Sequence, residues 1–247
     1  MRGPAVRFRK SAFILGFSLS ASLGSLLAAP AAFAADLGLR GSGPAFEQRL
    51  PYVAFYDWTG FYLGANVGYG WTRGSGNMAL AGIPGTFSGS GDGLLGGLQA
   101  GYNWQSGAFV LGLETDIQAS GGRGDINAVA GPLAATGSAK MPYFGTIRGR
   151  LGYAADNWLL YVTGGGLYGK STLDGTVSTF GPFSSSATYW SYVVGGGVEM
   201  ALWSRWSAKL EYLYAGTPSN VPAPPAASSV SGSGSTHILR TGVNYRF

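Results

Sequence analysis

Hydrophobic and polar positions alternate along a long stretch that begins near residue 58. In WTGFYLGANVGYGW, residues 58–71, one face carries Phe61, Leu63, Ala65, Val67 and the aromatic residues that follow, and the other face carries mostly Gly and Asn. A period of two residues predicts a β-strand. The stretch covers about fourteen residues, whereas ordinary globular strands are most often roughly 5–6 residues long.

Seven further stretches have the same character. Six of them alternate clearly, but the stretch WLLYVTGGGLYG is apolar on both faces, and its sequence does not orient it. No helical period appears after residue 58. The predicted strands after the first cover residues 96–105, 109–118, 141–153, 158–169, 189–202, 206–214 and 237–247.

The connections between these strands alternate in length. Two-residue turns are predicted at Ser106-Gly107, Asp156-Asn157 and Ser204-Arg205. The other four connections are rich in Gly, Ser, Thr and Pro, and they are predicted to be loops over residues 72–93, 119–140, 171–187 and 215–235. This pattern predicts an all-β, eight-stranded antiparallel transmembrane up-and-down β-barrel with short periplasmic turns and long extracellular loops.

Charged side chains decide which face of the strands points inward. At mid-strand, one lipid-facing Arg or Lys would cost about 2–4 kcal/mol, and nine such charges would exceed the roughly 5–15 kcal/mol that stabilises a domain. The charges are therefore predicted to line the lumen, which in an eight-stranded barrel is about wide enough for side chains to fill. They are Glu114, Asp116, Arg148, Arg150, Glu199, Lys209, Glu211, Arg240 and Arg246.

The chain ends within a predicted strand, ILRTGVNYRF, rather than in a polar tail. In hydrocarbon, an open sheet edge leaves unpaired N–H and C=O groups at several kcal/mol each. The last strand is therefore predicted to pair with the first one and to close the barrel.

The first residues form a separate segment. Arg2, Arg7, Arg9 and Lys10 precede an apolar run, and Ala32-Phe33-Ala34 fits a small-x-small cleavage site. Residues 1–34 are predicted to be a signal peptide that is cleaved between Ala34 and Ala35; the alternative is an uncleaved membrane anchor. Residues 35–57 lack a steady period and are predicted to be a linker or N-terminal tail, followed by the barrel domain over residues 58–247.

Composition narrows the functional classes. Charged residues make up 11% of the 247 residues, against roughly 25% in an average soluble domain. The formal net charge of +5 includes four cations of the predicted signal peptide, so the remaining twelve Lys and Arg and eleven Asp and Glu give +1. This balance gives no reason to expect a nucleic-acid partner. The absence of Cys fits a chain that crosses an oxidising compartment without needing disulfides.

Two short motifs and the single His raise further functional possibilities. The G-x-G-x-x-G match at Gly91–Gly96 follows a predicted loop and enters a strand, whereas a dinucleotide site needs a strand before it and a helix after it. Arg123-Gly124-Asp125 falls in a predicted surface loop, which leaves host adhesion open. His237 is the single His and could ligate haem iron, but the sequence offers no partner ligand and no Cys for a metal cluster.

Carboxylate pairs also raise the question of catalysis. Glu114 with Asp116, and Glu199 with Glu211, could act as acid and base. Catalysis by a nucleophile also needs an activating base, and no G-x-S-x-G motif accompanies the single His. The carboxylates are therefore interpreted as counter-charges to the lumen cations. No enzyme activity, metal or cofactor is predicted.

Taken together, several motifs resemble a known family. WTGFYLGANVGYGW, GLQAGYNWQ, RGRLGYAADNWLLYVTGG, AKLEYLY and VNYRF are similar to segments of the small outer-membrane β-barrel proteins of alphaproteobacteria, within the OmpA-like and OmpX-like eight-stranded superfamily. The resemblance covers about residues 58–247. It implies an envelope-structural and surface-antigen role in the cell outer membrane of a Gram-negative bacterium. Some relatives are called porins, and haem binding is attributed to some.

The resemblance also implies two partners. One is outer-membrane lipid, and the other is the outer-membrane assembly machinery, which would read a C-terminal signal at Val243, Tyr245 and Phe247. The leading hypothesis is thus a structural barrel whose lumen is filled by polar side chains. The alternatives are a narrow channel for ions or small solutes, and ligand or host binding through the loops. The oligomeric state is not predicted.

Overall fold

The computed structural model describes residues 56–216, 223–224 and 227–247 of the chain. They belong to a compact unit that spans Val53–Phe247. The predicted signal peptide, its cleavage point between Ala34 and Ala35, and nearly all of the predicted tail lie outside the described residues. Among the residues described, no helix is long and apolar enough to cross a membrane.

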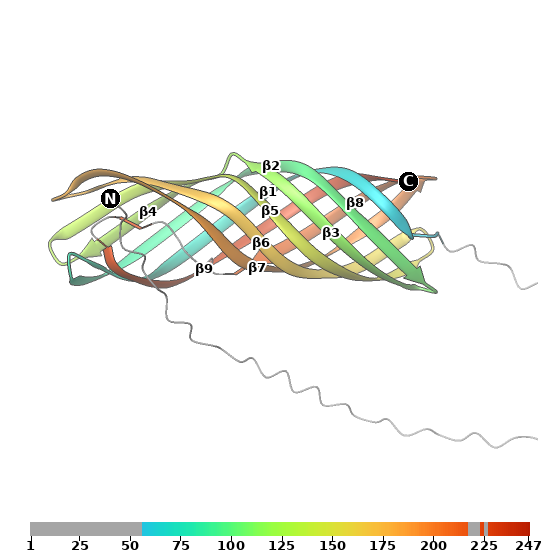
Figure 1. Ribbon diagram of the computed structural model, residues 1–247, viewed down its shortest axis with the longest axis horizontal. Coiled ribbons are helices and arrows are strands. Elements are labelled where there is room, and N and C mark those ends of the chain that lie inside the picture. The colour runs from blue at the N-terminus through green and yellow to red at the C-terminus, as the bar shows by residue number, and fades with distance from the viewer. Residues whose placement is uncertain (1–55, 217–222, 225–226) are drawn as a thin grey trace, which may run out of the picture. The chain divides into compact units, whose positions relative to one another are not determined.

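The described strands pair in antiparallel fashion to form one ring (Figure 1). Strands β3 and β4 both pair with β2 on one side and β5 on the other, so they form one strand interrupted at residues 121–122. The ring therefore has eight positions, as the sequence predicted. The strands are β1 Gly60–Leu80, β2 Ile83–Ser106, β3 Phe109–Ser120, β4 Arg123–Ala130, β5 Leu133–Ala155, β6 Trp158–Val177, β7 Gly181–Trp203, β8 Trp206–Ala215 and β9 Ala227–Arg246.

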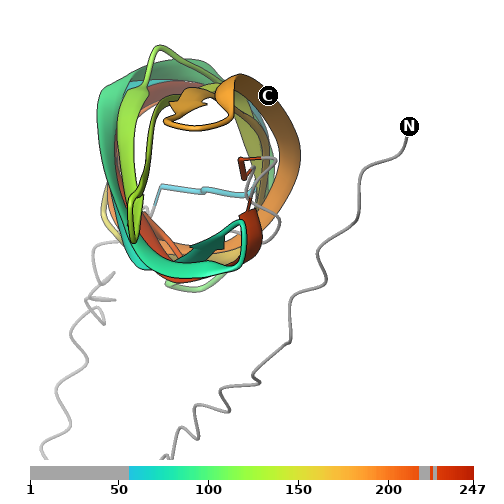
Figure 2. The same ribbon diagram turned by 90° about the vertical axis from the view of Figure 1, so that its left-hand side faces the viewer.

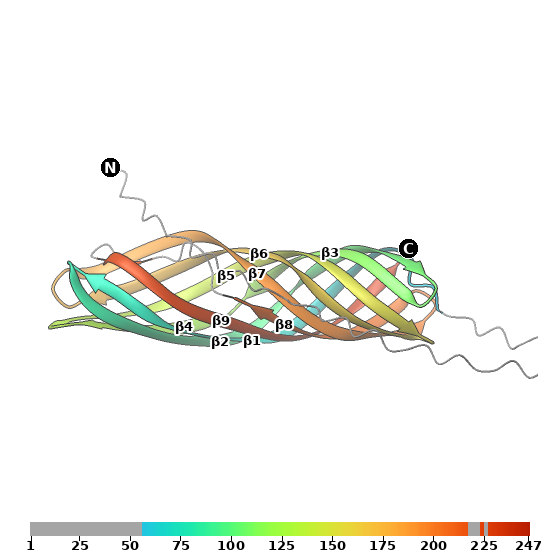
Figure 3. The same ribbon diagram turned by 90° about the horizontal axis from the view of Figure 1, so that it is seen from below.

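The last strand closes the barrel, as predicted. Strand β9 runs beside β1 from the Tyr62–Arg246 pair to the Leu80–Ala227 pair, and it also pairs with β8 (Figure 3). The backbone N–H of Phe247 donates to the carbonyl oxygen of Phe61 at 3.0 Å. The hydrogen-bonded seam therefore extends to the last residue of the chain.

Three of the four segments predicted as long loops, 72–93, 119–140 and 171–187, consist largely of strand, which corrects that part of the prediction. In the fourth segment, 215–235, residues 227–235 belong to β9, and residues 217–222 and 225–226 lie outside the described residues. β1 continues to Leu80 and meets β2 through a tight turn at Ala81 and Gly82, whose φ angles of 47° and 82° suit a two-residue hairpin. Composition suggested loops because these segments are poor in hydrophobic residues. Backbone hydrogen bonding needs no hydrophobic side chain, so Gly-rich and Ser-rich segments pair as hairpin extensions.

Two of the three predicted short turns lie where the sequence placed them, at Asp156-Asn157 and at Ser204-Arg205. The third is shifted by one residue, to Gly107-Ala108. Gly107 has a φ of 61°, a conformation that glycine adopts without steric cost. Ser106 continues the ladder of β2 opposite Phe109 instead.

Exposure alternates along the strands and confirms the predicted faces. Leu98 is 64% exposed, whereas its neighbour Gln99 is buried at 2%. The structure also orients β6, which the sequence could not. On β6, Leu160 and Val162 face outward, and Leu159 and Tyr161 face inward.

The interior is layered along the barrel axis. Near the short turns lies a lower apolar cluster built by Trp58, Val110, Ala154, Leu159, Tyr161 and Ala201. An upper apolar cluster contains Leu95, Phe144, Leu167, Tyr189, Val193, Leu213, Ala215 and Ile238. Along β6, the inward side chains pass from Leu159 through Thr163 to Leu167, so polar side chains occupy the level between the two clusters.

Trp58 does not begin the first strand, in contrast to the prediction. It precedes β1, and its side chain is 2% exposed within the lower apolar cluster. Its backbone N–H donates to Oε1 of Gln105 at 2.6 Å, and the N–H of Gln105 donates to Oγ1 of Thr59 at 3.1 Å. Residues 56–59, drawn in light blue, cross the bore at this end (Figure 2). The segment thus turns into the lumen.

Candidate functional site

Eight charged side chains meet in the middle of the lumen, and we refer to them as the lumen network. They come from β3, β5, β7, β8 and β9, and none is more than 4% exposed. Four are cations and four are anions, so their formal charges cancel. They are Glu114, Asp116, Arg148, Arg150, Glu199, Lys209, Glu211 and Arg240.

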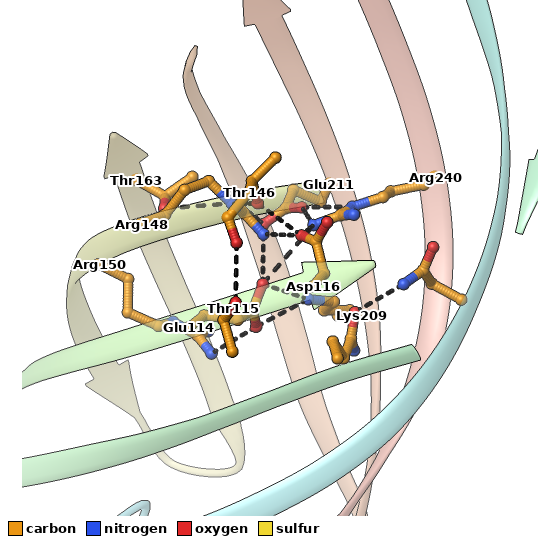
Figure 4. Close-up of polar contacts among 12 residues, drawn as sticks. Glu114, Thr115, Asp116, Thr146, Arg148, Arg150, Thr163, Lys209, Glu211 and Arg240 are labelled. Atoms are coloured by element: carbon orange, nitrogen blue, oxygen red, sulfur yellow. Dashed lines mark hydrogen bonds and ion pairs between the residues drawn. The ribbon is translucent and has the colours of Figure 1, made fainter. Parts of the chain in front are cut away.

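Arg148 lies at the centre of the lumen network (Figure 4). Its Nη2 contacts Oε1 of Glu114 and lies 3.1 Å from Oδ2 of Asp116, and its Nη1 lies 3.0 Å from Oε1 of Glu211. Its Nε donates to Oγ1 of Thr146 at 2.9 Å. The planar guanidinium is thus surrounded by three carboxylates whose positions match its fork of donors.

Two further cations join the same carboxylates. Nε of Arg240 donates to Oε2 of Glu211 at 2.6 Å, and its Nη2 donates to Oδ2 of Asp116 at 3.0 Å. Nζ of Lys209 lies 3.0 Å from both oxygens of Glu114. Asp116 and Glu211 therefore each bridge Arg148 and Arg240, and this sharing links β3, β5, β8 and β9 across the lumen.

A second group of contacts lies nearer the short turns. Nη2 of Arg150 donates to Oε2 of Glu199 at 2.8 Å, and its guanidinium lies 4.0 Å from the ring centroid of Tyr161. The Tyr62 hydroxyl donates to Oε2 of Glu114 at 2.7 Å. Nδ2 of Asn244 donates to the other oxygen of Glu199 at 2.7 Å. Arg150 is thus held between the lower apolar cluster and the rest of the lumen network.

Arg246 lies outside the lumen network, although the sequence analysis placed it there. Its guanidinium lies 4.3 Å from the ring centroid of Tyr56, and the side chain is only partly buried. Arg246 occupies an inward position in the alternation of β9, but it is the last residue of that strand. The alternation correctly predicts that Arg246 faces inward. Because it lies at the end of the strand, its side chain is at the mouth of the barrel and not in the middle of the lumen.

The other candidate catalytic and metal-binding residues are engaged in separate contacts. Both carboxylate pairs are engaged by the cations of the lumen network. His237 faces outward, stacks on Trp71 at 5.6 Å between ring centroids, and shares a 2.6 Å hydrogen bond between its Nδ1 and the Tyr212 hydroxyl. In the described part of the chain, no group of three or more His, Cys, Asp or Glu could hold a metal ion.

Two sequence motifs lie in regular strands. The glycine motif Gly91–Gly96 is part of β2 and leads into no helix. Arg123-Gly124-Asp125 begins β4, which pairs with β2 on one side and β5 on the other. The tripeptide is therefore part of the barrel wall and not of a flexible loop, which corrects the expectation from sequence.

The predicted C-terminal signal residues share the outer face of β9. Phe247 is 62% exposed and Val243 45% exposed. The Tyr245 ring packs edge-on against Trp206 at 5.2 Å and against Phe247 at 5.1 Å between centroids. These side chains form an aromatic cluster on the outside of the barrel at the end where the short turns lie.

A closed antiparallel barrel with an apolar exterior and a charged interior defines an integral β-barrel protein of the outer membrane, because the ring of strands leaves no open sheet edge and the charged side chains face the lumen instead of lipid. Comparison with known proteins agrees with this class. The sequence model of the family described as outer membrane protein beta-barrel domain matches residues 19–247, and the chain belongs to this family.

Relatives support this assignment. The chain is 34% identical over 233 residues to the 31 kDa outer-membrane immunogenic protein of Brucella melitensis, covering 89% of this chain and 95% of that protein. It is 32% identical over 167 residues to the 22 kDa outer membrane protein of Rhizobium leguminosarum bv. viciae, covering 68% of each chain. The protein is therefore one of the bacterial outer membrane.

Solved structures show a more distant similarity. The outer membrane protein OprG from Pseudomonas aeruginosa has a TM-score of 0.46 at 12% identity, with 76% of this chain and 96% of that chain covered. Neisserial surface protein A has a TM-score of 0.41 at 14% identity, with 76% and 98% covered.

Proposed function

We propose that this protein is a structural outer-membrane barrel whose lumen is closed by its own side chains, and that it is neither a channel nor an enzyme. The observation that carries this proposal is the lumen network, in which eight buried charges pair with one another from five strands. Apolar clusters line the lumen on both sides of this network. The interior is thus filled at three successive levels.

The energetics of the lumen network disfavour a channel. An ion that crossed the centre of the barrel would have to displace pairs such as Arg148 with Glu211 and Arg240 with Asp116. Breaking a buried pair so that one partner is left uncompensated costs about 3–5 kcal/mol. Because neighbouring pairs share their carboxylates, opening a path would break several pairs together.

The outer surface supports a role in the cell envelope. The hairpin extensions lie at the end opposite to the short turns, the end that faces outward in proteins of this kind. The Brucella relative is named as immunogenic, and we infer that the hairpin extensions of this chain are also accessible at the cell surface. The alternative of ligand binding at His237 is weakened because Tyr212 already engages its Nδ1.

The absence of catalysis is part of the same proposal. Glu114, Asp116, Glu199 and Glu211 are each bound to at least one cation. The single His lies on the outside of the barrel, whereas these carboxylates lie inside it. In the described part of the chain, the single His is therefore not brought together with these carboxylates to activate a nucleophile.

Planar-bilayer conductance of the refolded full-length barrel tests the closed lumen. Wild-type protein should give no stable single-channel steps near neutral pH, and a porin inserted in the same bilayers verifies detection. Stable steps from the wild type would overturn the proposal and favour the channel. In cells, deletion of the gene should raise sensitivity to detergent without slowing uptake of small solutes.

A further inference from the structure

Charged side chains on the outside of the described barrel are confined to its two ends. The middle of the outer wall carries apolar side chains such as Leu113 and Leu160, which are 58% and 63% exposed. At the end of the short turns, the outer charges are Asp156 and Arg205. Towards the hairpin extensions they are Arg73, Asp92, Arg123, Asp125, Lys140, Lys170 and Asp174.

A belt of aromatic side chains lies just below the second group. Trp71 and His237 oppose each other on β1 and β9, and Tyr168 packs on Trp190 at 5.7 Å between β6 and β7. Rings of Trp and Tyr at such positions lie at the level of the lipid headgroups. Side chains one step farther toward the hairpin extensions therefore face the headgroups of the outer leaflet.

Three cations occupy this step on adjoining strands. Arg123 on β4 is the direct register partner of Lys140 on β5. Lys170 on β6 opposes Tyr143, which lies just past the irregularity in β5 that follows Lys140. Arg123, Lys140 and Lys170 are all exposed, and we call them the outer basic triad.

The outer basic triad lies near carboxylates but is not ion-paired with them. Like charges directly opposite each other on one face of a sheet destabilise the pair. Among the described residues, no carboxylate forms an ion pair with any of the three cations. Asp92 on β2 is the register partner of Arg123 on the side away from Lys140, and it accepts a hydrogen bond from the Tyr69 hydroxyl. Asp125 on β4 and Asp174 on β6 both lie opposite Ser138, one step farther from the aromatic belt than Lys140. Asp174 accepts a hydrogen bond from the Ser184 hydroxyl at 2.7 Å.

We propose that the outer basic triad binds the phosphate groups of an outer-leaflet lipid. Guanidinium and ammonium groups form charge-assisted hydrogen bonds with phosphate oxygens, and basic clusters at the membrane surface bind phosphorylated headgroups. Below the triad, Ile117 and Ile147 are 56% and 61% exposed and oppose the acyl chains. The cations and this apolar wall together fit a lipid rather than a free anion.

The triad also gives Arg123-Gly124-Asp125 a role different from adhesion. The backbone of this tripeptide is paired on both sides, so it cannot leave the sheet to enter the site of another protein. Its Arg123 side chain faces outward beside Lys140. The proposal rests on the barrel lying in the outer membrane, and it does not depend on whether the lumen conducts.

Lipid binding to the folded full-length barrel tests the proposal. The barrel is held in neutral detergent, and native mass spectrometry is used to titrate diphosphorylated lipid A and its dephosphorylated form. The triple variant Arg123→Gln, Lys140→Gln, Lys170→Gln should bind the diphosphorylated lipid about tenfold or more weakly. The dephosphorylated lipid should bind equally weakly to the wild type and to the triple variant.

Arg73→Gln is the matched control, because Arg73 lies on β1 near the same level but is separated from the triad by Asp92. Each single triad variant should weaken binding more than Arg73→Gln does. Equal effects would replace the proposal with general surface attraction, and an unchanged triple variant would overturn it. Inorganic phosphate that displaces the lipid at equal concentration would assign the site to a free anion instead. A heat-modifiable gel shift establishes that each variant is folded.

Discussion

Glu114 on β3 lies directly opposite Arg148 on β5, and the two side chains form an ion pair inside the barrel. The register of two neighbouring strands thus fixes the pair before any side-chain rotamer is chosen. A slip of one residue in this register would turn one of the two charges into the lipid. The lumen network therefore helps to specify strand pairing as well as to fill the lumen.

Replacing Arg148 with Ala should destabilise the barrel. The substitution leaves Glu114, Asp116 and Glu211 without their shared guanidinium in a site that is almost inaccessible to water. A loss of about 3–5 kcal/mol in the free energy of unfolding is expected. The measurement is the urea midpoint of unfolding from lipid vesicles, followed by the heat-modifiable gel shift.

Two variants accompany this test. Glu114→Ala should lower the midpoint similarly, because Lys209 then loses the carboxylate 3.0 Å from its Nζ. Arg123→Ala is the control, because its side chain is exposed on the outer wall and such changes usually alter stability little. Equal urea midpoints for all three variants would contradict a paired interior.

Replacing Trp58 with Ala should also weaken the barrel. The Trp58 side chain is 2% exposed and fills the lower apolar cluster with Val110 and Leu159. Removing a buried Trp side chain costs about 3–5 kcal/mol. Trp203→Ala is the matched control, because the Trp203 side chain is 64% exposed. If the two variants unfold at the same urea concentration, Trp58 does not contribute through its place in the lumen.

Much of this fold could be predicted from the sequence because the barrel imposes a period of two on every strand. The faces of β3 and β8 followed from the charges they carry, since Glu114 and Lys209 can only face the lumen. Strand β6 carries no charge in its membrane-spanning part, so its orientation had to come from the register. There Tyr161 reaches Oε1 of Glu211 with its hydroxyl at 3.0 Å.

Three features could not be read from local pattern. The hairpin extensions are stabilised by backbone pairing, both within each hairpin and with the next strand of the ring, and side-chain composition does not report this pairing. Trp58 enters the lumen because the lower apolar cluster offers it a buried site, and that cluster is assembled from β3, β5, β6 and β7. Arg246 occupies an inward position in the alternation of β9, as lumen residues do, but its position along the barrel axis depends on where β9 ends.

The N-terminal segment carries a prediction that lies outside the described residues. If residues 1–34 are a signal peptide, N-terminal sequencing of the protein purified from the envelope should begin at Ala35. The small-x-small signal at Ala32 and Ala34 is the physical basis, since the signal peptidase site accepts small side chains. A mature chain that begins at Met1 would favour the membrane anchor instead.

Deleting Phe247 should affect folding and cellular assembly to different degrees. Its side chain is 62% exposed on the outer wall, where it packs near Phe61 and Tyr245. The deletion also removes the backbone hydrogen bond from Phe247 to Phe61. One rim side chain and one hydrogen bond contribute little to a seam that continues through the Leu80–Ala227 pair, so refolding into synthetic bilayers should be only modestly weakened.

Assembly in cells should fall much further, if the assembly machinery recognises Val243, Tyr245 and Phe247 as the terminal signal. The heat-modifiable gel shift of the folded band, measured in vesicles and in cell envelopes, separates the two effects. Phe61→Ala is a matched control, because it removes an aromatic partner from the same cluster and leaves the C-terminus intact. It should assemble in cells nearly as well as the wild type. Normal cellular assembly of the Phe247 deletion would show that the terminal residues serve only to close the barrel.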